Sequence, residues 1–71
     1  MRAKFLAESV SNHASGNTVV NLAPVLKSTE ENKSFWQATP SGKLEMCITN
    51  PKATEFFKAG VEYYVDFTPA T

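Results

Sequence analysis

The sequence predicts a mainly β protein that folds as a small five-stranded barrel, and two features support this class. Apolar and polar residues alternate in two late segments, Leu44–Ile48 and Val61–Phe67, as in strands with one buried face. Turn-forming residues separate the predicted strands, most clearly Pro40 and Gly42. A closed barrel is favoured because closing short strands on themselves limits the exposed edges that promote aggregation.

The first two strands are predicted in the first third of the chain. Arg2–Val10 is the first, with apolar residues on both parities, which indicates partial burial on both faces. Residues 11–17 are rich in Ser, Asn and Gly and predict a loop. Thr18–Val25 contains a β-branched run and is the second strand. Pro24 marks its end, an edge or a bulge, because proline cannot donate a ladder hydrogen bond.

The middle of the chain predicts a polar loop followed by a third strand. In the loop Lys27–Lys33, Ser28 and Glu31 have the spacing of a capping box, which is compatible with one helical turn. Ser34–Ala38 is then predicted to enter a tight hairpin at Thr39–Gly42. There proline would preset the first corner of a type I turn and glycine would supply the positive φ of a bulge.

The last third predicts a strand, a short helix and a final strand. Between the alternating segments, Asn50–Gly60 reads as a helix of about two turns: Asn50 suits the N-cap, Pro51 the first helical position, and Gly60 a left-handed end. Its apolar residues would pack on the sheet, with one of the adjacent Phe56 and Phe57 nearer the rim. The predicted inner lining of the barrel is Leu44, Met46, Ile48, Val61, Tyr63, Val65 and Phe67.

The position of the short helix selects among barrel types. It precedes the last strand, as in SH3-like barrels, whereas an OB-fold usually places its helix one strand earlier. We therefore expect an SH3-like barrel, with an OB-like barrel as the alternative. At 71 residues the chain predicts one domain, 1–71, near the size at which a hydrophobic core alone gives marginal stability. Homo-oligomerisation or a bound partner would relieve that margin.

Composition limits the cellular compartment and the kinds of partner that we expect for the protein. One cysteine excludes an intrachain disulfide and favours a reducing compartment, and no apolar run reaches the roughly 18 residues of a membrane span. We therefore expect a cytoplasmic protein without membrane contact. Seven basic and seven acidic side chains give zero formal charge, which disfavours nucleic acid as a partner without excluding it.

Two aromatic residues, Trp36 and Tyr64, are the main candidates for a binding site. Phe35 and Trp36 are adjacent, so on a strand they would point to opposite faces, and one would be exposed or at an interface. Trp36 together with Tyr64 could form a platform for a base or a partner protein. The alternative is that the helix or a loop covers Trp36. The remaining predicted ligand- or partner-binding residues are Lys33, Lys43 and Asn32.

The sequence shows no catalytic or metal-binding constellation. His13 and Cys47 are far apart in sequence, and zinc needs three or four converging ligands. No glycine-rich phosphate loop is present. We therefore predict no enzymatic activity, no cofactor and no metal site, and we interpret Cys47 as a small residue under a partner strand or subunit.

Three segments together resemble small, mostly uncharacterised proteins of tailed phages: Glu31–Trp36, Thr39–Gly42 and Gly60–Phe67. The resemblance covers about half the chain and supplies no site residue. It implies an accessory or virion protein that acts in a bacterial host, and therefore a location in the host cytoplasm or in the virion.

These observations lead to three functional hypotheses. The first is a noncatalytic binding module, a homo-oligomer that captures a host protein or a small ligand such as a nucleotide signal through exposed aromatics and the Lys27–Lys33 loop. The second is a minor virion structural protein whose strand edges pair between subunits. The third is a barrel that binds single-stranded nucleic acid through Trp36, Tyr64, Lys33 and Lys43.

Overall fold

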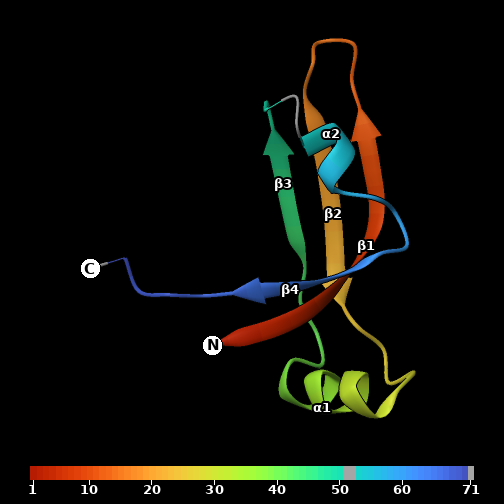
Figure 1. The fold of residues 1–71 in the computed structure, drawn as a ribbon, viewed down its shortest axis with the longest axis vertical. Helices are drawn as coiled ribbons and strands as arrows, with labels where there is room; N and C mark the ends of the chain where they lie inside the picture. The colour runs from red at the N-terminus through yellow and green to blue at the C-terminus, as the bar shows by residue number, and fades with distance from the viewer. Residues whose placement is uncertain (51–52, 71) are drawn as a thin grey trace.

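The computed structural model describes residues 1–50 and 53–70, and there the chain forms an open antiparallel sheet of four strands with two short helices (Figure 1). The strands are β1 (Arg2–Asn12), β2 (Thr18–Pro24), β3 (Leu44–Ile48) and β4 (Glu62–Asp66). The helices are α1 (Glu30–Ala38) and α2 (Ala53–Phe56). The strand order in the sheet is β3-β2-β1-β4. The mainly β class is thus confirmed.

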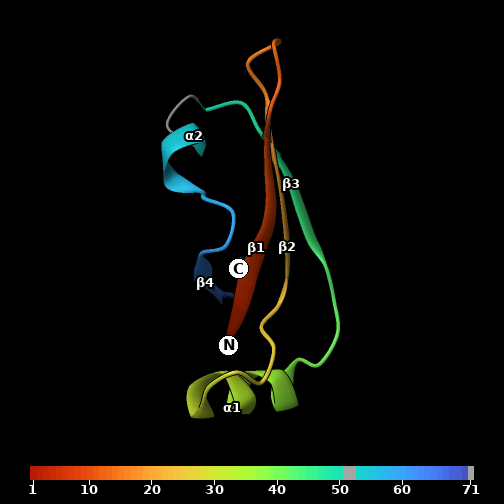
Figure 2. The same ribbon diagram turned by 90° about the vertical axis from the view of Figure 1, so that its right-hand side faces the viewer.

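The long strand β1 organises the sheet because it pairs with different neighbours along its length. Its first part, Arg2–Leu6, pairs with β4, and its second part, from Phe5 onward, pairs with β2. The register with β2 shifts between Ala7 and Ser9, which leaves Glu8 as an extra residue on β1. Such a bulge bends a strand and increases its twist. The sheet therefore curls, and β4 crosses in front of the other strands (Figures 1 and 2).

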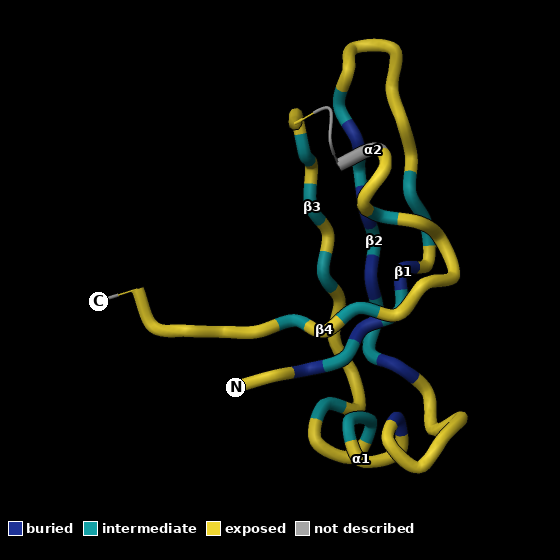
Figure 3. The backbone as a smooth tube through the Cα atoms, viewed as in Figure 1, coloured by how far each residue is buried: buried dark blue, intermediate teal, exposed yellow. Residues whose placement is uncertain are grey.

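The hydrophobic core lies on the concave face of this curled sheet. Its buried members come from the two central strands: Ala3, Phe5, Ala7, Val20 and Leu22. Half-buried apolar residues of the edge strands surround them: Leu44, Met46, Ile48, Tyr63 and Val65. Phe57 packs on the cluster from the chain just after α2. Burial is accordingly concentrated in β2 and the first half of β1, whereas the C-terminal segment is exposed (Figure 3).

The closed five-stranded barrel is not what the structure shows, because the segment predicted as its third strand is helical. Residues 34–38 form the second half of α1, and the four strands that remain leave β3 and β4 as free edges. Phe35 and Trp36 therefore do not point to opposite faces of a strand. Both lie half-buried on α1.

Local interactions explain why this segment is a helix. Thr29 is the N-cap, and its hydroxyl accepts a hydrogen bond from the backbone N–H of Asn32 at 3.0 Å. Glu30 and Glu31 occupy the first turn, where negative charge is favourable. Asn32, Phe35 and Trp36 are spaced i, i+3, i+4 and form the less exposed face. The prediction of helical capping in this loop was correct, but the capping residue is Thr29 and not Ser28.

The predicted hairpin at Thr39–Gly42 is also wrong. With a helix before it, this segment connects α1 to β3, and β3 pairs with β2 instead. Gly42 does have a positive φ, 152°. A turn-forming sequence specifies a change of direction, and the elements on either side decide whether that turn closes a hairpin.

The final third agrees with the sequence more closely. The two strands appear with the predicted parity, and Gly60 has a φ of 87°. The helix is shorter than expected and ends at Phe56, while the predicted first helical residue, Pro51, lies outside the described residues. Of the two phenylalanines, Phe56 is the outer one. Two residues of the predicted lining, Val61 and Phe67, are 41% and 51% exposed.

Among the described residues, no helix has the length and apolar character needed to cross a membrane.

Candidate functional site

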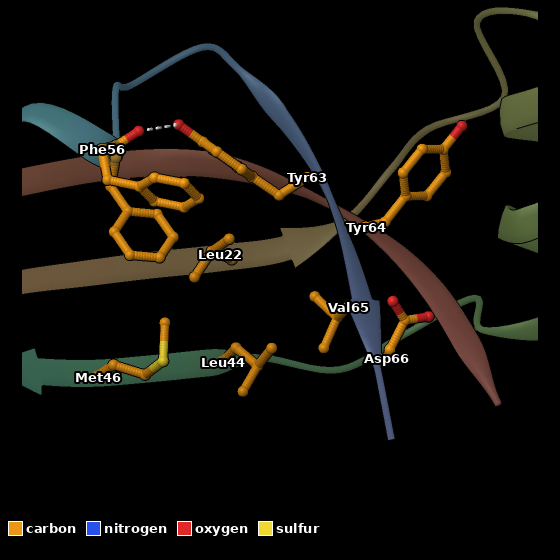
Figure 4. Close-up of a pocket in the computed structure, with 9 residues that line it drawn as sticks. Leu22, Leu44, Met46, Phe56, Tyr63, Tyr64, Val65 and Asp66 are labelled. Atoms are coloured by element: carbon orange, nitrogen blue, oxygen red, sulfur yellow. Dashed lines mark hydrogen bonds between the residues drawn. The ribbon is translucent and has the colours of Figure 1, made fainter. Parts of the chain in front are cut away.

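An apolar pocket lies on the concave face, between the curled sheet and α2 (Figure 4). Its volume is about 310 Å³. Residues of β2 and β3 form the floor, β4 forms one wall, and Phe56 at the end of α2 forms another together with Phe57, which follows the helix. The lining residues are Leu22, Leu44, Met46, Phe56, Phe57, Tyr63, Tyr64, Val65 and Asp66.

Tyr63 fixes the α2 side of this pocket. Its hydroxyl donates to the carbonyl oxygen of Phe56 at 3.0 Å and accepts from the backbone N–H of Lys58 at 2.9 Å. Its ring also lies 5.2 Å from the ring of Phe57 and 5.8 Å from that of Phe56. Because both hydrogen-bonding functions of the hydroxyl are used by the backbone, the wall facing the pocket is the aromatic ring. The pocket therefore suits an apolar group.

The aromatic wall is only partly covered from solvent. The ring of Phe57 meets that of Phe56 edge to face at a centroid distance of 4.8 Å, and Phe56 remains 63% exposed. Leu44 and Met46 are half-buried on the floor. Apolar area in these places stays in contact with water, so a ligand that covered it would gain hydrophobic free energy on binding.

The opposite face of β4 has a different chemistry. The hydroxyl of Tyr64 donates to Glu31 of α1 at 2.6 Å, and the same carboxylate oxygen lies 2.7 Å from the Lys4 ammonium. The Arg2 guanidinium and the Lys4 ammonium lie 4.7 and 5.5 Å from the centre of the Tyr64 ring, within the range of cation–π attraction. We call Arg2, Lys4, Glu31, Tyr64 and Asp66 the charged cluster. It joins α1 to the β1–β4 pair.

Hydrogen bonds perturb the titration of this cluster. The bond from Lys4, and then that from Tyr64, lowers the pKa of Glu31, while the bond to Glu31 raises the pKa of Tyr64. The hydrogen bond from Arg2 lowers the pKa of Asp66, which accepts from the guanidinium at 2.7 and 3.1 Å. These directions are those expected for a solvated structural network, since all the groups are held in their ordinary charge states at neutral pH.

Asn32 lies on the buried face of α1, next to Glu31 of this cluster. It is 1% exposed, and its side-chain N–H₂ donates to Glu62 at 2.7 Å and to Ser28 at 3.2 Å. Its side-chain oxygen has no hydrogen-bond partner among the described residues. The amide orientation is nevertheless defined, because only the nitrogen can donate to the Glu62 carboxylate. Asn32 thus serves as a buried link between α1 and β4.

Four of the five residues predicted from the sequence as a binding site lie on or beside α1, and the fifth, Lys43, precedes β3. Asn32, Lys33 and Trp36 lie on α1, and Tyr64 contacts that helix through Glu31 and through Phe35, whose ring is 5.9 Å away. Lys43 is exposed and lies 3.5 Å from Glu45. Tyr64 alone among the five also borders the pocket. Their role in binding stays a prediction.

Trp36 is less exposed than a free aromatic platform would be. It is half-buried, and the Lys27 ammonium lies 5.0 Å from the centre of its ring. Part of the ring surface is therefore occupied by a neighbouring cation. The proposed Trp36–Tyr64 platform would have to form at the α1 end of the molecule, with each ring already in contact with basic side chains.

The sequence predicted most pocket residues as core residues but not as a binding surface. The alternation of β3 and β4 correctly turned Leu44, Met46, Tyr63 and Val65 to one face. What remained uncovered depended on how far the sheet curls and where α2 ends. The adjacent Phe56 and Phe57 were the available signal, because two neighbouring rings cannot both be buried by one short helix.

Within the described part of the chain, no group of three or more His, Cys, Asp or Glu side chains is placed to hold a metal ion. Comparison with known proteins found no matching family model, no matching curated protein and no matching solved structure.

Proposed function

We propose that this chain is a noncatalytic binding module whose pocket takes an apolar group, either of a small ligand or of a side chain that anchors a partner protein. The observation that carries the proposal is a pocket of about 310 Å³ with aromatic and aliphatic walls on a small domain. Ligand pockets are typically apolar concavities of about 300–1,000 Å³ with few polar groups, and this one is at the lower end of that range.

The size of the pocket limits the ligand. A compact aromatic group fits a volume of this scale better than a whole nucleotide does, so a nucleotide would bind through its base. Ligands of about 20 non-hydrogen atoms commonly gain about 0.3 kcal/mol per atom, which corresponds to a dissociation constant of tens of micromolar. The proposed setting, a tailed-phage product in the cytoplasm of its bacterial host, rests on the sequence resemblance alone.

The test uses anilinonaphthalene sulfonate as an apolar probe, followed by backbone and methyl NMR shifts of the folded protein. We expect saturable binding with a dissociation constant of tens of micromolar and shifts centred on Leu22, Met46 and Val65. Shifts confined to Trp36 and its neighbours would favour the aromatic platform on α1 instead. The absence of saturable binding at either place would contradict the proposal.

Two variants make the test specific. Met46→Trp places a bulky indole ring in the pocket, where it would occupy space that the probe needs. Probe binding should weaken by at least about tenfold, since an apolar contact of this size contributes about 1.5–3 kcal/mol. Cys47→Ser is the matched control, because Cys47 is the next residue of β3 and is exposed. Cooperative thermal unfolding of each variant shows that the fold is retained.

The nucleic-acid hypothesis has weaker support than the pocket. Of the two lysines in that hypothesis, Lys43 lies 3.5 Å from Glu45, so this carboxylate would compete with a phosphate for the Lys43 ammonium. The virion hypothesis is distinguished by mass spectrometry of purified particles, where a structural protein would be present at a regular copy number.

A further inference from the structure

The outer edge of β3 is open, and Glu45 is the one charged residue among its five. β3 ends the sheet, and its outward N–H and C=O groups make no backbone hydrogen bond among the described residues. Its register with β2 is continuous, without a bulge, and Leu44–Ile48 contains no proline. An edge with these properties is a template for another strand. We propose that a second copy of this chain pairs antiparallel along β3, joining the two sheets into one of eight strands.

The other free edge is a poorer candidate because of its charges. β4 presents Glu62, Tyr64 and Asp66 on its exposed face. If two copies of β4 paired antiparallel and symmetrically about Tyr64, Glu62 of each copy would lie opposite Asp66 of the other. The interface would then contain two such pairs of like charges. Like charges directly opposite each other destabilise a strand pair. Self-association through β3 avoids this repulsion.

Symmetry, charge and the number of residues paired together favour one register for the β3 pair. In a two-fold symmetric antiparallel pair, the apolar faces of the two copies lie on the same side of the sheet only if one residue lies directly opposite its own copy. The two-fold axis then passes between these two equivalent residues. An axis at Glu45 would oppose two carboxylates. An axis at Met46 pairs all five residues of β3. Leu44 then faces Ile48 of the second copy, and Glu45 faces Cys47 of the second copy.

The apolar face of β3 favours a second copy as the occupant, because the same face continues across the two-fold axis. Leu44, Met46 and Ile48 are half-buried, and in this register they continue onto the same residues of the second copy. The segment 67–70 runs past the β3 edge on the side of the sheet that carries α2 (Figures 1 and 2). It carries the half-exposed Phe67. A chain paired along β3 would meet this segment as well as the edge.

This inference is independent of the proposed function, because the pairing involves the rim of the sheet and does not need an occupied pocket. The first test measures the mass in solution over a range of concentrations. Dimerisation gives twice the 7.8 kDa of the chain. Cys47→Glu should increase the dimer dissociation constant about 2- to 30-fold, because it opposes Glu45 of the second copy in two symmetric pairs. Cys47→Lys, its matched counterpart, should decrease it by a similar factor.

Cysteine cross-linking tests the register. Glu45→Cys, with the native Cys47 retained, brings two thiols opposite each other across the interface and should give a disulfide-linked dimer under mild oxidation. Strand geometry would place the two Cys47 residues of the unmodified dimer about 8 Å from each other, so their cross-linking should be weak. Lys43→Cys is the control, because its partner is Thr49 of the second copy.

The mass and cross-linking measurements have distinct outcomes that support or overturn the β3 pairing. A dimer that responds in opposite directions to the two Cys47 variants, and that cross-links through Glu45→Cys, supports the pairing. A monomeric mass up to the solubility limit overturns it, as does a dimer that neither variant changes. Probe binding in the pocket should be the same in both Cys47 variants, so failure of the β3 interface and failure of the proposed function are separate outcomes.

Discussion

Tyr63 and Tyr64 are adjacent on β4, yet they belong to two different kinds of structure. Tyr63 lies on the concave face, where its hydroxyl is bound by backbone groups at the end of α2 and its ring packs against phenylalanines. Tyr64 lies on the other face, where its hydroxyl binds Glu31 and its ring contacts two cations. The period of two in a strand is enough to separate them.

The comparison shows two ways of attaching a helix to a small sheet. The concave face depends on burial, which has no preferred direction, and its cover by α2 is incomplete, so a pocket remains. The charged cluster holds α1 by directed hydrogen bonds to Glu31, whose side chain is about half exposed. Interactions of the second kind contribute less to stability and respond to pH and salt. Substitutions on the two faces should therefore differ in size and in their dependence on conditions.

The largest effect is expected on the concave face. Leu22→Ala should lower the free energy of unfolding by about 2–5 kcal/mol, because Leu22 is 2% exposed and its neighbours cannot fully close the cavity. Leu26→Ala is the control, expected within about 0.5 kcal/mol, since Leu26 is 70% exposed. Denaturant unfolding measures both. Equal losses would show that the assigned core is wrong.

A smaller loss is expected at Asn32, the buried link between α1 and β4. Asn32→Asp replaces a donor to Glu62 with a second carboxylate and should cost about 1–3 kcal/mol at neutral pH. Burial and Glu62 should raise the pKa of the new carboxyl group, so the loss should fade as the pH falls through that raised value. Lys33→Ala, at an exposed neighbouring position, is the control. A pH-independent loss would argue against electrostatic repulsion.

The charged cluster itself should make stability pH-dependent at both ends of the scale. Glu31 and Asp66 have pKa values lowered by folding, so their contribution is present above their unfolded pKa of about 4 and is lost as the pH falls through the folded values. Tyr64 has a raised pKa, so its contribution is present below about 10 and is lost as the pH rises further. Glu31→Gln with Asp66→Asn should flatten the acid limb of stability against pH. If the loss of stability at acidic pH is the same in this variant, groups other than Glu31 and Asp66 cause it.

The smallest effect is expected at Arg2, whose ion pair with Asp66 is more than half exposed on both sides. Arg2→Gln should lower the melting temperature slightly at low salt, and added sodium chloride should remove most of the difference because exposed pairs are screened. Melting curves at two salt concentrations measure it. A salt-independent difference would indicate that the packing of Arg2 on Tyr64 matters more than its charge.

Particular residues show how far sequence reasoning reached. The alternation of β3 and β4 was read correctly because a period of two needs only a buried side and a wet side. At residues 34–38 the same reasoning failed, because five residues are too few to separate two periods. The helical spacing of Asn32, Phe35 and Trp36, with Thr29 as the cap, was the competing signal.

The candidate site was less predictable than the fold. Trp36 and Tyr64 drew attention as aromatic residues, but only Tyr64 borders the pocket, and most of the other lining residues had been assigned to the core. A sequence pattern states which side of a strand is apolar, but it does not state how much cover that side receives. The bulge at Glu8 and the end of α2 at Phe56 set that cover here.

The sequence by itself determined the β class, the buried faces of β3 and β4 and the positive φ at Gly60, because these follow from interactions between near neighbours. Only the tertiary structure decided that residues 34–38 belong to a helix, that the sheet stays open, and that Asn32 is buried against Glu62. Each of these outcomes depends on contacts between segments distant in sequence. Their free energies are set by the packing of the whole chain.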